Sequence, residues 1–217
     1  MKVNSILIFL LTIISVQVLG QDDRKKPEAK SFTAEVNLNP FSSSPININY
    51  LRFRYFTSET SAVRIGFSVS AQKQTPEEDV TRKTFEFNIR PGYEWHLAGT
   101  ERLSPYFGVE ADFAIKTSSF EDQDVDADTK KISGAWTTSG VERGFTRIGL
   151  NALIGADFYV TKRVYVGTEF GFGFQRTGFS DIEITDDYPF TEDKIKGGND
   201  FELGPNFNSS IRLGFVF

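Results

Sequence analysis

The chain has 217 residues, which is enough for one closed domain, with a formal charge of −5, no cysteine and a single histidine. This balance excludes nucleic acid as the main partner, because no excess of lysine and arginine exists to neutralise phosphates. Disulfides, cysteine metal sites and multi-histidine centres are excluded too, so we expect no metal site and no cofactor. The 14% aromatic content and 18 glycines favour β structure with closely packed strands.

Residues 1–20 have the pattern of a secretory signal peptide. A short basic start precedes an apolar core at residues 6–14, and short side chains stand where signal peptidase requires them. The alternative is an uncleaved membrane helix, but the apolar run is shorter than the roughly 20 residues that such a helix needs. We expect the mature chain to begin near Gln21, and the charged residues 21–30 to form a flexible periplasmic leader.

Residues 31–217 alternate apolar and polar side chains with a period of two, which predicts β-strands throughout. The alternating segments are residues 32–38, 51–55, 63–71, 85–95, 107–116, 148–158, 164–175 and 210–217. Most approach the 9–11 residues with which a tilted strand crosses a bilayer, and their number is even. Two residues disturb the pattern. Leu153 falls on a polar face, and Pro91 removes a ladder hydrogen bond, which predicts a bulge or a strand end.

The connections between these segments alternate in length. Residues 57–60 and 161–163 are tight turns, and residues 96–104 form a modest one. The long polar connections are residues 72–81, 117–143 and 176–205, and only the first outer connection, residues 40–45, is short. With an even strand count all the long connections lie at one end, as the external loops of outer-membrane barrels do, and both termini are then periplasmic.

The composition of the two faces separates a membrane barrel from a soluble lipocalin-like barrel, which has the same alternation. The polar face mixes glycines with arginines and carboxylates, and arginine suits buried bidentate pairing. This predicts a lumen charge network, with Glu35 on the same face, formed by Arg52, Arg54, Arg64, Glu86, Arg90, Glu110, Asp112, Asp157, Glu169 and Arg212. The other face is almost free of charge, as lipid requires. Interfacial girdle residues are expected at Tyr55, Tyr93, Trp95, Phe158 and Tyr159.

With its alternating strands, its turn region at residues 155–169 and its C-terminal IRLGFVF at residues 211–217, the chain resembles the small outer-membrane barrels of the OmpA/OmpX type. The resemblance implies an all-β fold, namely an eight-stranded antiparallel up-and-down transmembrane barrel in the bacterial outer membrane. Its implied partners are outer-membrane lipid, lipopolysaccharide and the barrel-assembly machinery. The last strand, which ends with Phe215 and Phe217, resembles the assembly signal that this machinery reads. We expect no peptidoglycan-binding domain after residues 31–217, and therefore no cell-wall anchoring role.

Two features of the sequence are candidates for a reactive or metal-binding site. His96 falls in a predicted periplasmic turn beside Trp95, so interfacial packing is expected there rather than the catalysis of lipid A-editing barrels. Residues 121–128 are acidic and begin with the spacing of a calcium loop, but Ala127 and Ser133 stand where glycine and glutamate are required. A solvated loop is expected, with weak divalent-cation binding as the alternative.

An eight-stranded barrel has an interior just wide enough for side chains to fill, so a plugged lumen is favoured over a conducting one. We therefore expect no enzyme activity. The expected function is a structural or binding role that displays long acidic external loops, with the chain as an accessory subunit of an outer-membrane complex. The first alternative is a narrow channel for small solutes, and a lipid-modifying enzyme is the least favoured.

Overall fold

The computed structural model describes residues 26–38, 46–123, 130–187, 190–206 and 211–217. The expected signal peptide, the expected mature start at Gln21 and the short connection at residues 40–45 lie outside the described residues. No helix in the described part of the chain is long and apolar enough to cross a membrane.

The described residues form twelve β-strands. In chain order these are β1 (Phe32–Leu38), β2 (Ile46–Ser58), β3 (Ser61–Glu77), β4 (Val80–His96), β5 (Leu103–Asp122), β6 (Lys130–Ser133), β7 (Phe145–Tyr159), β8 (Val164–Phe179), β9 (Ile182–Asp187), β10 (Phe190–Ile195), β11 (Asn199–Asn206) and β12 (Ile211–Val216).

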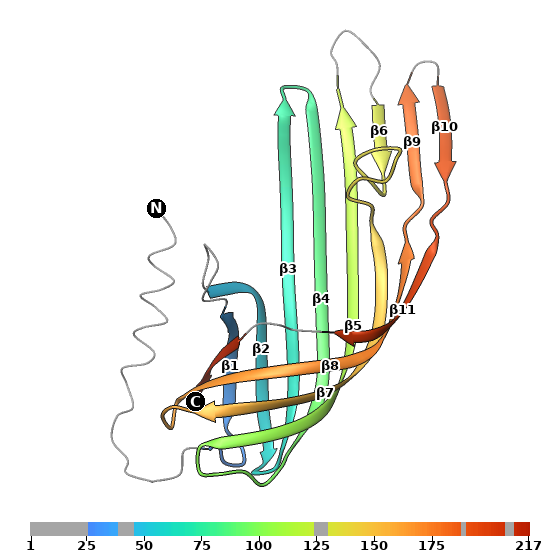
Figure 1. The fold of residues 1–217 in the computed structure, drawn as a ribbon. Coiled ribbons are helices and arrows are strands. Elements are labelled where there is room, and N and C mark those ends of the chain that lie inside the picture. Colours follow the sequence, from blue (N-terminus) through green and yellow to red (C-terminus); the bar gives the residue numbers. More distant parts are fainter. Residues whose placement is uncertain (1–25, 39–45, 124–129, 188–189, 207–210) are drawn as a thin grey trace.

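Eight of these strands close into a ring (Figure 1). The order is β1-β2-β3-β4-β5-β7-β8-β12, all neighbours are antiparallel, and β12 returns to β1 with Ala34 opposite Phe215. We call the end of the ring with the β7–β8 turn the lower end and the end with the β3–β4 turn the upper end. β11 pairs with the upper half of β8, and β12 pairs with the lower half of β8. The ring confirms the predicted eight-stranded antiparallel up-and-down barrel.

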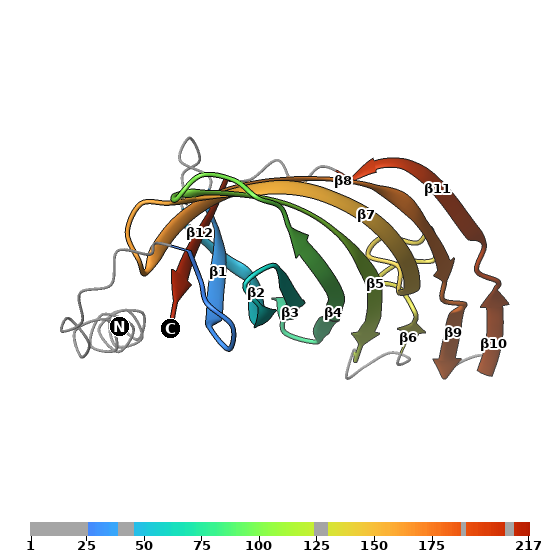
Figure 2. The same cartoon turned by 90° about the horizontal axis from the view of Figure 1, so that it is seen from below.

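The connections that were predicted as long loops are in large part β-strand, so that prediction was wrong. β3 and β4 continue until only Glu78 and Asp79 separate them, and β6, β9 and β10 extend the sheet beyond β5 (Figures 1 and 2). In β3 the residues from Ala71 to Glu77 are almost all exposed, so this part of the sheet has no apolar face. Hydrophobic periodicity therefore could not detect strands that are held by backbone pairing in water.

The ring is apolar outside and charged inside. Outward side chains between 40% and 63% exposed form what we call the outer belt: Val63, Ile65, Val69, Phe85, Trp95, Phe107, Val109, Phe113, Ile115, Ile148, Leu150, Ile154, Phe158, Phe170, Phe172 and Phe174. Buried arginines and carboxylates face the lumen instead. A water-soluble barrel would have the opposite polarity, so this ring is built to stand in lipid.

Two details of the strands correct the predictions. Tyr159 is not a girdle residue, because it shares the inward face of β7 with Asp157 and is fully buried, with its ring 5.1 Å from that of Tyr165. Pro91 causes neither a bulge nor a strand end. β4 continues through it, opposite Ile65 of β3, and its register with β5 is the same before and after the proline. The predicted position of Leu153 on the polar face is confirmed, because it points inward and is 5% exposed.

Residues 26–30, the described part of the expected leader, form a turn against the lower end of β2. Pro27 is buried, and the amide of Lys30 donates to the carbonyl of Phe56 at 2.7 Å. At the upper end Ile132, Ala135 and Ile182 form a small apolar cluster beside β6 and β9.

Candidate functional site: the charged lumen

Nine charged side chains of the described residues point inward in the lower half of the ring, and none is more than 2% exposed. We call them the lumen plug: Glu35, Arg52, Arg54, Arg64, Glu94, Glu110, Asp157, Glu169 and Arg212. They come from β1, β2, β3, β4, β5, β7, β8 and β12, so every strand of the ring contributes at least one. Because inward positions alternate along each strand, these long side chains meet near the axis of the barrel.

Arg54 stands at the centre of the plug. Its guanidinium nitrogens lie 2.6 Å from a Glu35 carboxylate oxygen, 3.0 Å from Glu94 and 2.7 Å from Asp157. These partners belong to β1, β4 and β7, so one guanidinium joins three strands, two of which are not neighbours of β2. Ion pairs as short as these, with both partners removed from water, are charge-assisted contacts of the strong kind.

The other three arginines complete the network. Arg64 lies 2.7 Å from Glu94, 2.8 Å from Glu110 and 2.7 Å from Glu169. Arg212 and Arg52 each bridge two carboxylates, with contacts at 2.8 and 3.1 Å for Arg212 and 3.2 Å for both partners of Arg52. Four of the five carboxylates contact at least two guanidiniums, so the plug is one connected cluster across the lumen.

Two buried tyrosines bond to this cluster. The hydroxyl of Tyr106 donates to Glu169 at 2.5 Å and accepts from Arg212 at 2.7 Å, and the hydroxyl of Tyr165 donates to Glu35 at 2.7 Å. Glycines opposite them leave the space that these rings occupy. A Cβ at Gly214 would stand 2.0 Å from the Tyr165 ring, a distance that no real packing allows.

The structure brings seven of the ten predicted network residues into the plug: Arg52, Arg54, Arg64, Glu110, Asp157, Glu169 and Arg212. Arg90 and Asp112 lie above it in a second cluster with Arg147, which we call the upper group. Glu86 lies further along β4, in register with Lys116 of β5.

The predicted network lacked one plug residue and three of its neighbours. Glu94 lies on the polar face of the segment 85–95, and Tyr165 has the inward parity of the segment 164–175. Tyr106 and Arg147 directly precede the segments 107–116 and 148–158, so the same parity extended by one residue finds them.

His96 packs inside the barrel, not at the interface that was predicted. It is the last residue of β4 and 6% exposed, with its ring 5.2 Å from Phe56 and 5.3 Å from Tyr106. Its Nδ1 lies 3.0 Å from Ser104 Oγ, and its Nε2 lies 3.3 Å from Glu94. This is a serine–histidine–glutamate sequence of contacts, but Ser104 is only 4% exposed. Arg54 and Arg64 also hold Glu94, so the histidine links the plug to the lower end of the barrel.

The remaining predicted features lie at the surface. Phe215 and Phe217 point outward at the lower end of β12, and the amide of Phe217 donates to Phe32 at 2.8 Å. In the described part of the chain no group of three or more histidines and carboxylates is placed to hold a metal ion. Residues 124–129 of the acidic stretch lie outside the described residues.

Comparisons with known proteins give distant structural likenesses only. No family model matches the chain, and no curated protein matches it significantly. Among solved structures it is similar to Ail, the attachment invasion locus protein of Yersinia pestis, at 12% identity over 88% of this chain and 100% of that one, with a TM-score of 0.39. It is similar to the outer membrane protein OprG from Pseudomonas aeruginosa at 12% identity over 89% of this chain and 98% of that one, with a TM-score of 0.43. It is also similar to the N-terminal β-barrel domain of OprF from the same organism at 12% identity over 88% of this chain and 100% of that one, with a TM-score of 0.33. The fold assignment therefore rests on the strand pairing and on the inside-out polarity of this chain itself.

Proposed function

We propose that this chain is an integral protein of the bacterial outer membrane whose plugged barrel holds a β-sheet in the external medium as a binding or structural scaffold. The lumen plug is the observation that carries this proposal. A solute that crossed the barrel would have to separate buried ion pairs, and removing one partner of such a pair costs about 3–5 kcal/mol. Among the described residues, the large element that extends beyond the outer belt is the sheet of β3, β4, β5, β6, β9 and β10, so the scaffold role falls to it.

Conductance of the purified barrel in planar lipid bilayers tests the plug. We expect no unitary current steps from the folded wild-type protein, because its nine plug residues are at most 2% exposed and paired across the lumen. A double variant, Arg64→Ala with Glu169→Ala, removes two large side chains that lie 2.7 Å apart and keeps the formal charge of the plug unchanged. Unitary current steps from this variant but not from the wild-type protein would support a plugged lumen. Current steps of equal size from the wild-type protein would overturn the plugged lumen and favour the narrow channel.

The display of the sheet depends on the orientation of the barrel. On β3 the last large apolar residue of the outer belt is Val69, and the strand continues from there to Glu77. We propose that this upper end is external and that the β7–β8 turn and both termini are periplasmic. The contacts of this sheet with other components would make the chain an accessory subunit, which mass measurement of the complex purified in mild detergent tests.

Thiol labelling of intact cells tests the orientation, and the chain suits it because it contains no cysteine. Thr75→Cys places a thiol at an exposed position near the β3–β4 turn, and Lys162→Cys places one in the exposed β7–β8 turn. A maleimide that does not cross membranes should label the first variant in intact cells, and both variants after the cells are broken. Labelling of Lys162→Cys alone in intact cells would reverse the orientation and refute external display.

A further inference from the structure

Above the plug the lumen contains a cavity of about 260 Å³. Its lining includes the side chains of the upper group, Arg90, Asp112 and Arg147, together with Asn151 and Gln175. Glu110 and Glu169 of the plug form its floor. The cavity is smaller than the roughly 300–1,000 Å³ of most organic ligand sites, so it suits a small ion with few atoms.

Two arginines share one carboxylate at this cavity. Arg90 Nε lies 3.1 Å from Asp112 Oδ2, and Arg147 Nη2 lies 3.8 Å from Asp112 Oδ1. Asp112 also accepts from the Asn88 side-chain amide at 2.5 Å. The contact of Arg147 is too long for a hydrogen bond, and the side chains of Arg90 and Arg147 keep 23% and 21% of their surface exposed. The two guanidiniums therefore keep unused donor capacity beside the cavity.

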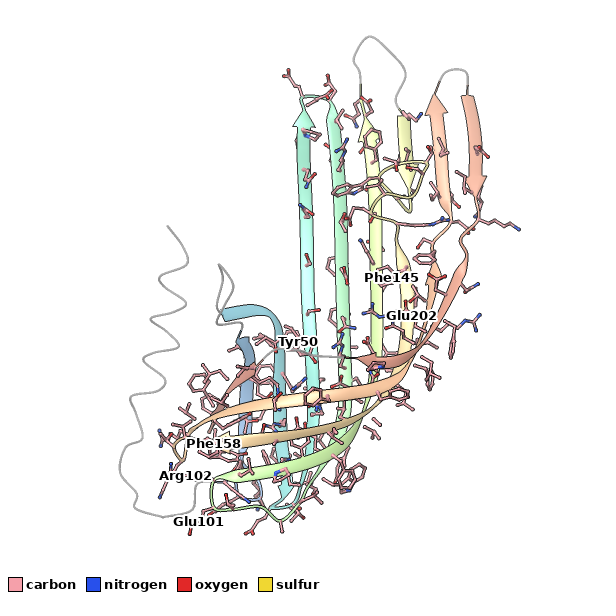
Figure 3. The ribbon with its side chains drawn as sticks, in the orientation of Figure 1. Tyr50, Glu101, Arg102, Phe145, Phe158 and Glu202 are labelled. Atoms are coloured by element: carbon pink, nitrogen blue, oxygen red, sulfur yellow. The ribbon has the colours of Figure 1, made fainter. Side chains whose placement is uncertain are left out.

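Aromatic rings hold both guanidiniums at this level of the lumen. The guanidinium carbon of Arg90 lies 5.2 Å from the centre of the Tyr50 ring, and that of Arg147 lies 5.5 Å from the centre of the Phe145 ring. Both rings lie far above Arg102 and the turn that contains it at the lower end (Figure 3). Such contacts orient a cation without neutralising its charge, so the arginines remain available to an anion.

The charges of the lumen divide unequally between its two levels. The plug has four arginines and five carboxylates, which gives a formal charge of 4 − 5 = −1. The upper group has two arginines and one carboxylate, which gives 2 − 1 = +1. The floor carboxylates Glu110 and Glu169 already contact Arg64 at 2.8 and 2.7 Å, so the unmatched positive charge lies with Arg90 and Arg147.

We propose that this cavity binds one small soluble oxyanion of the phosphate type, with Arg90 and Arg147 as its ligands. Guanidinium groups bind such oxyanions through paired, charge-assisted hydrogen bonds, and the cavity supplies two of them on opposite sides of Asp112. Asn151 and Gln175 add amide groups to the wall. Asp112 competes with the anion for both arginines. The plug closes the cavity from below, so in the plugged barrel the anion enters from the upper end and leaves by the same route.

Calorimetric titration of the folded barrel in detergent with inorganic phosphate at low salt tests this site. The wild-type protein should bind saturably, and Arg90→Gln and Arg147→Gln should each weaken binding at least tenfold. Asp112→Asn should strengthen binding, because it frees both arginines and raises the charge of the upper group. A residue with only a structural role would not produce that gain. Arg102→Gln, at an exposed position in the β4–β5 turn, is the matched control and should bind like the wild type.

Heat-dependent mobility on detergent gels shows whether each variant has folded before it is titrated. The absence of saturable phosphate binding by the folded wild-type protein would overturn the proposal, and so would unchanged affinity of the folded Arg90→Gln and Arg147→Gln variants. A phosphate-monoester lipid in the micelle should not change the affinity. Competition by that lipid would refute a soluble ligand and assign the arginines to a lipid headgroup. The conductance measurement tests the plugged lumen, and the phosphate titration tests the anion site. A negative result for one proposal can therefore be told apart from a negative result for the other.

Discussion

Replacement of Arg54 by methionine is the sharpest test of how the plug contributes to stability. Methionine keeps an unbranched side chain of similar length but removes the guanidinium. The change breaks contacts at 2.6, 3.0 and 2.7 Å with Glu35, Glu94 and Asp157. It also changes the formal charge of the plug from −1 to −2, because five carboxylates would then face three arginines.

The structure sets the size of the expected effect. Loss of one partner from a buried ion pair costs about 3–5 kcal/mol, since the other charge is left without compensation. Here each orphaned carboxylate keeps another guanidinium: Glu94 keeps Arg64, and Asp157 keeps Arg212. We therefore expect the lower limit, a loss of about 3 kcal/mol in the free energy of unfolding, or roughly 150-fold in the equilibrium constant.

Urea unfolding in lipid vesicles, followed by the fluorescence of the two tryptophans, measures this loss. Arg102→Met, in an exposed turn, is the control and should change stability by less than about 0.5 kcal/mol. The combination of Arg54→Met with Asp157→Asn should recover part of the loss, because it removes one uncompensated charge. If the free energy of unfolding of Arg54→Met lies within about 0.5 kcal/mol of the wild-type value, the ion pairs of the plug do not stabilise the barrel.

Three further predictions concern other parts of the molecule. Gly214→Ala should cost about 1–3 kcal/mol through overpacking against Tyr165, seen as a lower temperature at which the gel-shifted folded form is lost. The Gly197 amide, with a lysine ammonium, donates to Asp181 and lowers the pKa of that carboxyl below its ordinary value. Protection of the Gly197 amide from hydrogen exchange should therefore persist above about pH 4, the ordinary pKa of an aspartate, and be lost as the pH falls through the lowered value; Asp181→Asn should remove this dependence. Trp136→Phe removes a 2.9 Å hydrogen bond to a β4 carbonyl and should speed proteolysis of residues 134–144 without changing barrel stability.

The sequence was sufficient to predict the barrel because lipid and a narrow lumen impose opposite demands on alternate residues. Every strand of the ring shows the period of two, and the arginine-rich face turned out to be the inward one. The same rule places Tyr159 inside, two residues after Asp157. Tyr55, Trp95 and Phe158 are outward and exposed as predicted, and the girdle assignment was wrong for Tyr159 because closeness to a strand end was given more weight than parity.

The partners within the plug could not be predicted from the sequence. Arg54 and Asp157 are 103 residues apart, and their contact depends on the stagger of strands around the whole ring rather than on any local pattern. The strands beyond the upper end of the outer belt escaped prediction for a different reason, because neither face of a strand with exposed side chains on both sides needs to be apolar. Their stability comes from the backbone ladder and from cross-strand pairs, which composition does not reveal.

The plug also bears on how the ring closes. Arg212 of the last strand contacts Glu35 of the first at 2.8 Å, 177 residues away, at the same junction where β12 pairs with β1. If the pairing of β12 with β1 shifted by one residue, Arg212 would point outward and its ion pair with Glu35 would be lost. An arginine on the lipid face costs about 2–4 kcal/mol near the middle of a bilayer, and the loss of its buried partner adds to that. The backbone ladder alone would tolerate the slipped register, whereas the buried charges oppose it. Ion pairs that cross the lumen therefore select one closure of the barrel, a role that an apolar filling of the same volume would not perform.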